Sequence, residues 1–275
     1  MRAKFYSRDS IFFVLAFGFS WIFLIPAILL DRDASALPVA LLRYLGGIGP
    51  LVAAIVLTYL TQGREGRRDY WRRVVQVRRI GAGWYAVILL IVPLLTALAA
   101  LLDLLLGGGG AQPEAAARFL DQPLAILPFA LLTLIFGPLP EELGWRGYAL
   151  DRLQVKWSAL ASSLILGTAW TLWHLPLFFI EGTYQSNLGL GTLSFWLFMA
   201  DKIPQSILMT WIYNHNRRST LSAVLFHFMV NFIGELYELS GRAELYYILL
   251  WIVAAVAVTV IWGPRTLTHR RDKGK

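Results

Sequence analysis

Long apolar stretches separated by short polar segments run along the whole chain. A stretch needs about 20 residues to cross a hydrocarbon core of about 30 Å. By this measure eight stretches qualify, covering residues 11–30, 39–61, 82–106, 122–143, 158–180, 191–213, 220–238 and 244–263. The pattern predicts an all-α polytopic membrane protein, a bundle of about eight transmembrane helices. No sequence boundary splits off a soluble domain, so we expect a single integral membrane domain over residues 1–275.

Positive charge is concentrated in every second segment between these stretches. Lys and Arg gather at the N-terminus, in "GREGRRDYWRRVVQVRR", after the fourth stretch, in "NHNRRST" and in the C-terminal tail. Cytoplasmic loops collect Lys and Arg, so the alternation predicts both termini in the cytoplasm. We expect the membrane to be a prokaryotic plasma membrane. The arginine-rich segment with its aromatic residues is typical of a helix that lies on the lipid headgroups.

The overall composition agrees with a membrane protein. Apolar residues make up 57% of the chain and charged residues only 15%, whereas soluble domains carry about a quarter charged residues. A net charge of +8 would suggest nucleic acid in a soluble protein, but the basic loops account for it here and we expect no nucleic-acid partner. Because cysteine is absent, disulfides, thiolate catalysis and Cys-ligated metals are excluded.

A few ionisable side chains interrupt the apolar stretches. Each costs at least about 2.5–3.5 kcal/mol at membrane depth, so each is a candidate functional group. Arg43 and Asp103 lie near the outer ends of their stretches and are interpreted as structural, while Asp201 and Lys202 are adjacent and can neutralise one another. The remaining polar residues form three clusters: Glu141, Glu142 and Arg146; Trp170 and His174; His227 and Asn231.

Helical spacing relates the members of these clusters. Glu142 and Arg146 are four residues apart on one helical face and suit an ion pair, while Glu141 points about 100° away and stays free. Two histidines, two carboxylates, an arginine and an asparagine in nearby stretches predict one shared polar site. The set fits activation of water, with a carboxylate as general base and histidines that bind a metal or donate hydrogen bonds. Asn231 suits stabilisation of an oxyanion.

The depths of the two histidines are in tension with a shared site. At about 1.5 Å per residue, His227 lies roughly 10 Å from the cytoplasmic end of its stretch and His174 about 20–25 Å. The two can meet only if helices tilt, break at Pro176 or begin later than the apolar pattern indicates.

The three clusters together resemble the motifs of the CPBP family of intramembrane proteases. This family is also called the CAAX-protease and bacteriocin-processing, or abortive-infection, family, and includes the type II CAAX prenyl endopeptidases. Its motifs are E-E-x-x-x-R, aromatic-x-x-x-H and H-x-x-x-N/D. Here they are Glu141-Glu142-x-x-x-Arg146, Trp170-x-x-x-His174 and His227-x-x-x-Asn231. The second motif often begins with Phe, and Trp170 keeps its aromatic character. The catalytic helical core is expected at about 122–240.

The resemblance implies an enzyme, an intramembrane endopeptidase of the CPBP type. Its expected partners are the lipid bilayer and a membrane-associated peptide or protein substrate, prenylated if the enzyme follows CAAX processing. Two other functions stay open. One is a non-catalytic, immunity-type membrane protein that keeps the polar core for structure, and the other is a proton-coupled transporter that uses the carboxylates and histidines as a relay.

Six residues carry the chemistry that the resemblance implies: Glu141, Glu142, Arg146, His174, His227 and Asn231. Glu141 and His174 would activate the attacking water, His227 with Asn231 would stabilise the oxyanion, and the remaining pair would support the site. Two schemes stay open for the water. It is either activated without a metal, or bound to zinc held by Glu141, His174 and His227, whose ligand types suit this ion.

Overall fold

The computed structural model describes residues 3–30 and 32–268, and in them the chain is almost wholly helical. Its N-terminal part consists of α1 (Ala3–Leu29), α2 (Leu37–Gly47), α3 (Gly49–Thr61), α4 (Arg64–Val75), the 3₁₀ turn η1 (Val77–Arg79) and α5 (Ala82–Leu105). The middle consists of β1 (Ala111–Gln112), α6 (Glu114–Asp121), η2 (Pro123–Ala125), α7 (Ile126–Phe136), α8 (Pro138–Gly144), the π-helical turn η3 (Trp145–Ala149) and α9 (Leu150–Lys156). The C-terminal part consists of α10 (Ala159–Trp173), η4 (Leu175–Phe179), α11 (Tyr184–Leu188), α12 (Leu193–His215), α13 (Thr220–Leu236), β2 (Glu238–Leu239) and α14 (Gly241–Trp262).

Each of the eight predicted stretches forms a helix or consecutive helices, as expected for an all-α membrane bundle. Four helical spans within the described residues are long and apolar enough to cross a membrane: Ser10–Leu29, Ala82–Leu105, Pro123–Lys156 and Gly241–Trp262. The pair α2 and α3, bent by 41°, adds a fifth if it counts as one span. Only 11% to 28% of these four windows is buried, so most of their apolar side chains face outward, as in lipid-facing helices.

The other three predicted spans are shorter or more polar than the apolar pattern indicated. With 15 residues in α10 and 17 in α13, both are shorter than a core of about 30 Å at a rise of about 1.5 Å per residue. At 23 residues α12 is long enough, but it carries Asp201 and Lys202 within it. By length and composition, therefore, four or five of the eight stretches qualify as full spans.

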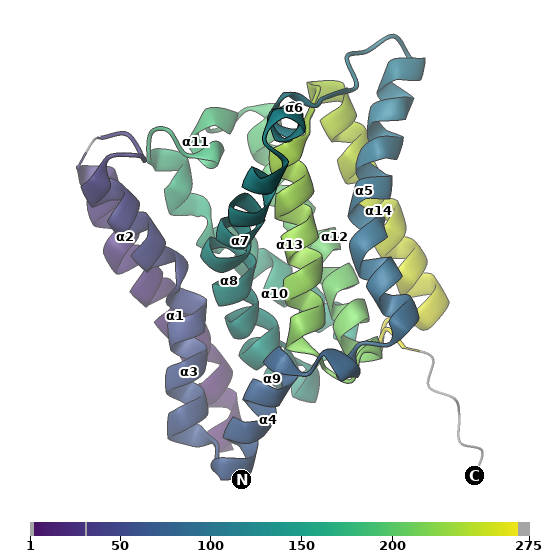
Figure 1. Cartoon of the computed structure of the whole chain (residues 1–275). Coiled ribbons are helices and arrows are strands. Elements are labelled where there is room, and N and C mark those ends of the chain that lie inside the picture. Colours follow the sequence, from purple (N-terminus) through teal and green to yellow (C-terminus); the bar gives the residue numbers. More distant parts are fainter. Residues whose placement is uncertain (1–2, 31, 269–275) are drawn as a thin grey trace.

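The bundle has a central group of helices between two outer groups. Figure 1 shows α1–α3 on one side, α5 and α14 on the other, and α7, α8, α10, α12 and α13 between them. The central helices α10 and α12 cross closely at Gly167, where an added Cβ would lie 3.1 Å from the Cα of Ile203 and the Cβ of Ser206. A continuous cluster of buried side chains joins α1 to α14 through Phe12, Trp170 and Trp251. The central helices, which carry the three motifs, therefore lie between the two outer groups.

Asp103 joins two helices at one end of the bundle, which agrees with the structural role expected from its position. Its carboxylate accepts hydrogen bonds from the backbone of Gly110 at 2.9 Å, from the Ser240 hydroxyl at 2.6 Å and from Arg242. At the same place β1 and β2 pair antiparallel. These contacts tie the end of α5 to the start of α14.

Candidate active site

The segment that carries both glutamates changes its helical geometry twice. α8 ends at Gly144, the π-helical turn η3 follows, and α9 continues from Leu150. π-helical turns are rare and occur frequently at functional sites. Gly144 packs directly on Pro50 of α3, where an added Cβ would overlap the proline. The contact with α3 thus fixes this segment immediately after the two glutamates.

Glu142 is the centre of a fully buried ion pair. The Nη1 atom of Arg146 lies 2.9 and 3.0 Å from the two carboxylate oxygens, and both side chains have an exposed fraction of 0%. The other terminal nitrogen of Arg146 donates to Ser206 Oγ of α12 at 3.1 Å. The Nδ1 atom of His227 lies 3.0 Å from Glu142 Oε1. The predicted pairing at i and i+4 is present, and it extends to α12 and α13.

Glu141 points to a different partner and is not free, which corrects the expectation from spacing. The indole nitrogen Nε1 of Trp170 donates to Glu141 Oε2 at 2.6 Å. Helical spacing could not predict this contact because the two residues are 29 positions apart. Within the described part of the chain, the structure records no hydrogen bond to the second oxygen, Oε1.

His174 lies at the point where the fifth predicted stretch breaks. α10 ends at Trp173, and η4 begins at Leu175 with Pro176 in its first turn. The Nδ1 atom of His174 lies 2.8 Å from the backbone oxygen of Trp170. Both histidines nevertheless lie beside Trp170, whose ring centroid is 6.0 Å from that of His174 and 4.9 Å from that of His227. The two therefore meet although they lie at different distances along α10 and α13.

The partners of the two histidines determine their tautomers. A backbone carbonyl and a carboxylate only accept hydrogen bonds, so Nδ1 carries the proton in both His174 and His227. The Nε2 atom of each ring is therefore the one left for water, substrate or a metal.

Asn231 lies where α7 ends and α8 begins. Its side-chain Nδ2 would be 3.0 Å from a Cβ added to Gly137, the residue between those helices. Gly137 is one helical turn before Glu141, and its backbone oxygen accepts from the Glu141 amide at 3.3 Å. The asparagine is half-buried. The structure thus brings the third motif to the beginning of the first one.

Sequence reasoning missed three contributors to this cluster. Trp170 was recognised as an aromatic motif residue but not as a hydrogen-bond donor, and Ser206 was not singled out. Lys202 was interpreted as the partner of Asp201, to which it does bind at 2.8 Å. However, its Nζ also lies 5.6 Å from the Trp170 ring centroid, at the edge of the site. The available signal in the sequence was the spacing of Lys202 and Ser206. Four residues apart on α12, they lie on one helical face and could have been predicted to reach the same site.

The three predicted metal ligands are not arranged around one point that could hold an ion. Among the described residues, no group of three or more His, Cys, Asp or Glu side chains is placed to hold a metal ion. Glu142 is already engaged by Arg146 and His227, and Glu141 by Trp170. Zinc at Glu141, His174 and His227 therefore stays a prediction, and no chemical step is derived through it.

Two comparisons with known proteins agree with the motifs. Residues 123–233 match the sequence model of the family described as type II CAAX prenyl endopeptidase Rce1-like, and all six predicted site residues lie in this range. CAAX prenyl protease 2 of Methanococcus maripaludis is 27% identical over 261 residues, which are 94% of this chain and 96% of the relative. The resemblance predicted from the three motifs is thus confirmed, and this chain is similar to the Rce1-like type II CAAX prenyl endopeptidases over the region that forms the buried site.

Proposed function

We propose that this protein is an intramembrane endopeptidase that hydrolyses a peptide bond near the C-terminus of a prenylated, membrane-associated substrate. The observation that carries the proposal is the buried cluster in which Glu141, Glu142 and His227 meet around Trp170. The names of the matching family and of the archaeal relative supply the substrate class. Their similarity to this chain supports the proposal for the substrate.

Glu141 is the proposed general base. Trp170 holds its Oε2 atom, so Oε1 can accept a proton from a water molecule. The Nε2 atom of His174 can accept a hydrogen bond from the same water, because Nδ1 is committed to the Trp170 carbonyl. The resulting hydroxide adds to the scissile carbonyl carbon. When the C–N bond breaks, Glu141 returns the proton to the leaving amine, as general acid–base catalysis requires.

His227 and Asn231 are the proposed oxyanion donors. The side-chain amide of Asn231 is always a hydrogen-bond donor. His227 donates through Nε2 in the form that carries a proton on both ring nitrogens. The Glu142 carboxylate lies 3.0 Å from Nδ1 of His227 and holds the orientation of the ring. Arg146 balances the remaining negative charge of Glu142. A donor held in place in a water-poor site typically contributes about 2.7–4 kcal/mol to transition-state stabilisation.

Cleavage of defined peptides tests the assignment. The full chain, purified in detergent, is incubated with prenylated CAAX peptides, their unprenylated counterparts and a library of membrane-protein tails. Wild type is compared with Glu141→Gln and His227→Ala, and Glu235→Gln is the matched control. Glu235 lies on the same helix as His227, but its one recorded side-chain hydrogen bond to a described residue is with Thr133, outside the site. Cleavage of prenylated peptides by wild type and control alone supports the proposal, and equal cleavage by all four proteins contradicts it.

The same sample tests zinc. Chelation that abolishes cleavage, with recovery on adding zinc, would support the metal-assisted scheme, and unchanged cleavage would support the metal-free one. Metal analysis of the purified protein accompanies the assay, because a weakly held ion can be lost during purification.

The topology of the chain is part of the proposal: both termini lie in the cytoplasm of a prokaryotic cell. The start of α1, α4 and the end of α14 lie at the same end of the bundle (Figure 1), and α4 is rich in arginine. The chain has no cysteine, so single substitutions report orientation directly. In intact cells, an impermeant maleimide should label Ser35→Cys, in the loop before α2, but not Glu65→Cys on α4. The opposite pattern would reverse the orientation.

A further inference from the structure

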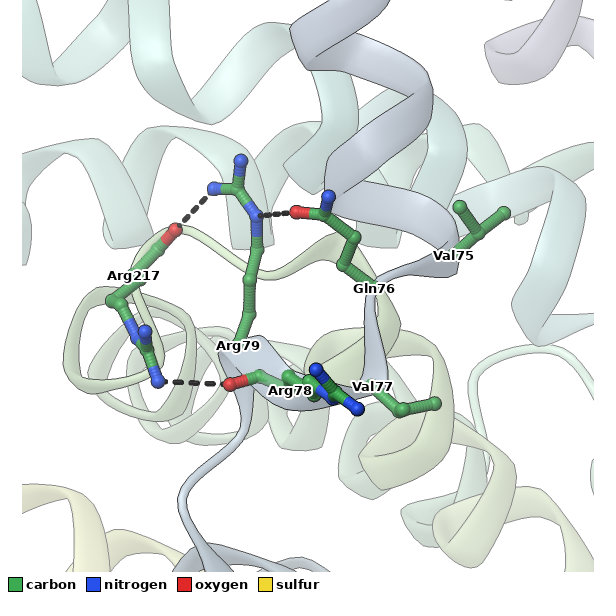
Figure 2. Close-up of a pocket in the computed structure, with 6 residues that line it drawn as sticks. All are labelled: Val75, Gln76, Val77, Arg78, Arg79 and Arg217. Atoms are coloured by element: carbon green, nitrogen blue, oxygen red, sulfur yellow. Dashed lines mark hydrogen bonds between the residues drawn. The ribbon is translucent and has the colours of Figure 1, made fainter.

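An arginine-lined groove lies at the end of the bundle that carries α4, outside the proposed active site. Its walls are formed by Val75–Arg79, which comprise the end of α4 and η1, and by Arg217 in the turn between α12 and α13 (Figure 2). The groove is open and has a volume of about 370 Å³. That is within the range of sites that accommodate small ligands.

Reciprocal hydrogen bonds hold the two walls together. Arg79 donates from Nη1 to the backbone oxygen of Arg217 at 2.8 Å, and Arg217 donates from Nη2 to the backbone oxygen of Arg78 at 2.8 Å. Figure 2 shows the guanidinium of Arg79 between the backbone oxygen of Arg217 and the side-chain oxygen of Gln76, to both of which it donates. Arg217 has a φ of 53° and Arg218 a φ of 57°. Non-glycine residues in this left-handed region are uncommon, and such conformations cluster at functional sites.

The charges at this place are only partly balanced. Asp69 pairs with Arg73 and Arg79, and Asp151 pairs with Arg73 and Arg218. The guanidinium of Arg78 forms no ion pair with any described residue, and that of Arg217 donates only to a backbone carbonyl. Two uncompensated guanidinium groups therefore line one groove, and guanidinium geometry matches the oxygens of a phosphate group.

The surroundings of the groove are those expected at the level of lipid headgroups. α5, a candidate span, begins at Ala82, three residues after the groove. In its first turn Trp84 packs on Trp211 of α12 at 4.7 Å between ring centroids, and Trp211 packs on Trp262 at 5.0 Å. Tryptophan is enriched where a membrane meets water. Val75 and Val77 beside the arginines are 67% and 57% exposed, which suits contact with lipid more than with water.

We infer that this groove binds the phosphate group of an anionic phospholipid from the adjoining leaflet. Arg78 and Arg217 contact the phosphate. Arg79 holds the two walls together through its hydrogen bond to the backbone of Arg217, and the two valines contact the upper part of the acyl chains. The site holds the turn between α12 and α13 at a fixed position in the membrane. This inference is independent of the proposed peptidase activity, since none of its residues belongs to that site.

Lipid binding by the full chain tests the inference. The detergent-purified protein is titrated with phosphatidylglycerol and, separately, with phosphatidylcholine. Native mass spectrometry measures how much of each lipid is bound. Wild type should prefer phosphatidylglycerol, and Arg78→Gln and Arg217→Gly should each weaken its binding about fivefold, the contribution of one basic residue at a membrane surface. Glycine tolerates the left-handed backbone at position 217, so that variant keeps the turn. Arg64→Gln, at the exposed far end of α4, is the matched control and should change binding less than twofold.

Three results would overturn the inference. One is equal affinity of wild type and both groove variants for phosphatidylglycerol. Another is an equal loss in Arg64→Gln, which would indicate diffuse surface attraction. The third is displacement of the lipid by millimolar inorganic phosphate, which would identify a site for a soluble anion.

Discussion

Replacing Trp170 by phenylalanine tests how the carboxylate of Glu141 is held in place. The substitution keeps an aromatic ring between His174 and His227 but removes the indole N–H that donates to Glu141 Oε2 at 2.6 Å. Phenylalanine is also the residue that the family motif often carries here. The change therefore separates the hydrogen bond from the aromatic packing of the motif.

The expected loss follows from the strength of that bond. A hydrogen bond to a charged group contributes about 1.5–3 kcal/mol. If the bond serves to hold Glu141 in its reactive orientation, its removal lowers kcat about 10- to 100-fold, since about 1.4 kcal/mol corresponds to a factor of ten. Loss of core volume adds a stability cost of about 0.5–3 kcal/mol, typical of a point substitution.

The assay is steady-state cleavage of a quenched fluorescent peptide, with thermal unfolding measured alongside. Trp251→Phe is the control, because Trp251 is also fully buried but packs on Phe226 and Tyr247 of the outer interface. It should lose similar stability but keep kcat. In a Glu141→Gln background, Trp170→Phe should have little further effect, since its partner's charge is already gone. A kcat for Trp170→Phe within twofold of the control would refute the positioning role.

Three further predictions concern stability. Glu142→Ala leaves Arg146 buried and unpaired, so it should destabilise the fold by about 3–5 kcal/mol in denaturant titrations; an unchanged midpoint would contradict the ion pair. Gly144→Ala should destabilise by about 1–3 kcal/mol because its Cβ meets α3, whereas Gly18→Ala, which has open space, should be neutral or stabilising. Asp103→Asn should speed proteolysis of the loop after α5, since three donors lose a charged acceptor; cleavage at the wild-type rate would argue against this anchor.

The helices were predictable because apolar runs and their polar breaks are local properties of the chain. All eight stretches form helices, and the basic segment from Arg64 forms α4. How many of them cross a membrane was less predictable, because apolar residues buried inside a bundle and those facing lipid have the same composition. α10 illustrates this, since its stretch continues to Ile180 but the helix ends before His174.

The sequence by itself determined which polar groups the protein places among its apolar helices, and it determined the pairing of Glu142 with Arg146. That pair depends only on the helical period, which sets side chains four residues apart on one face. Only the tertiary structure decided that Trp170 bonds to Glu141 and that His227 bonds to Glu142. These partners are 29 and 85 positions apart, so their meeting depends on how α8, α10 and α13 pack. No periodicity along the chain encodes that packing.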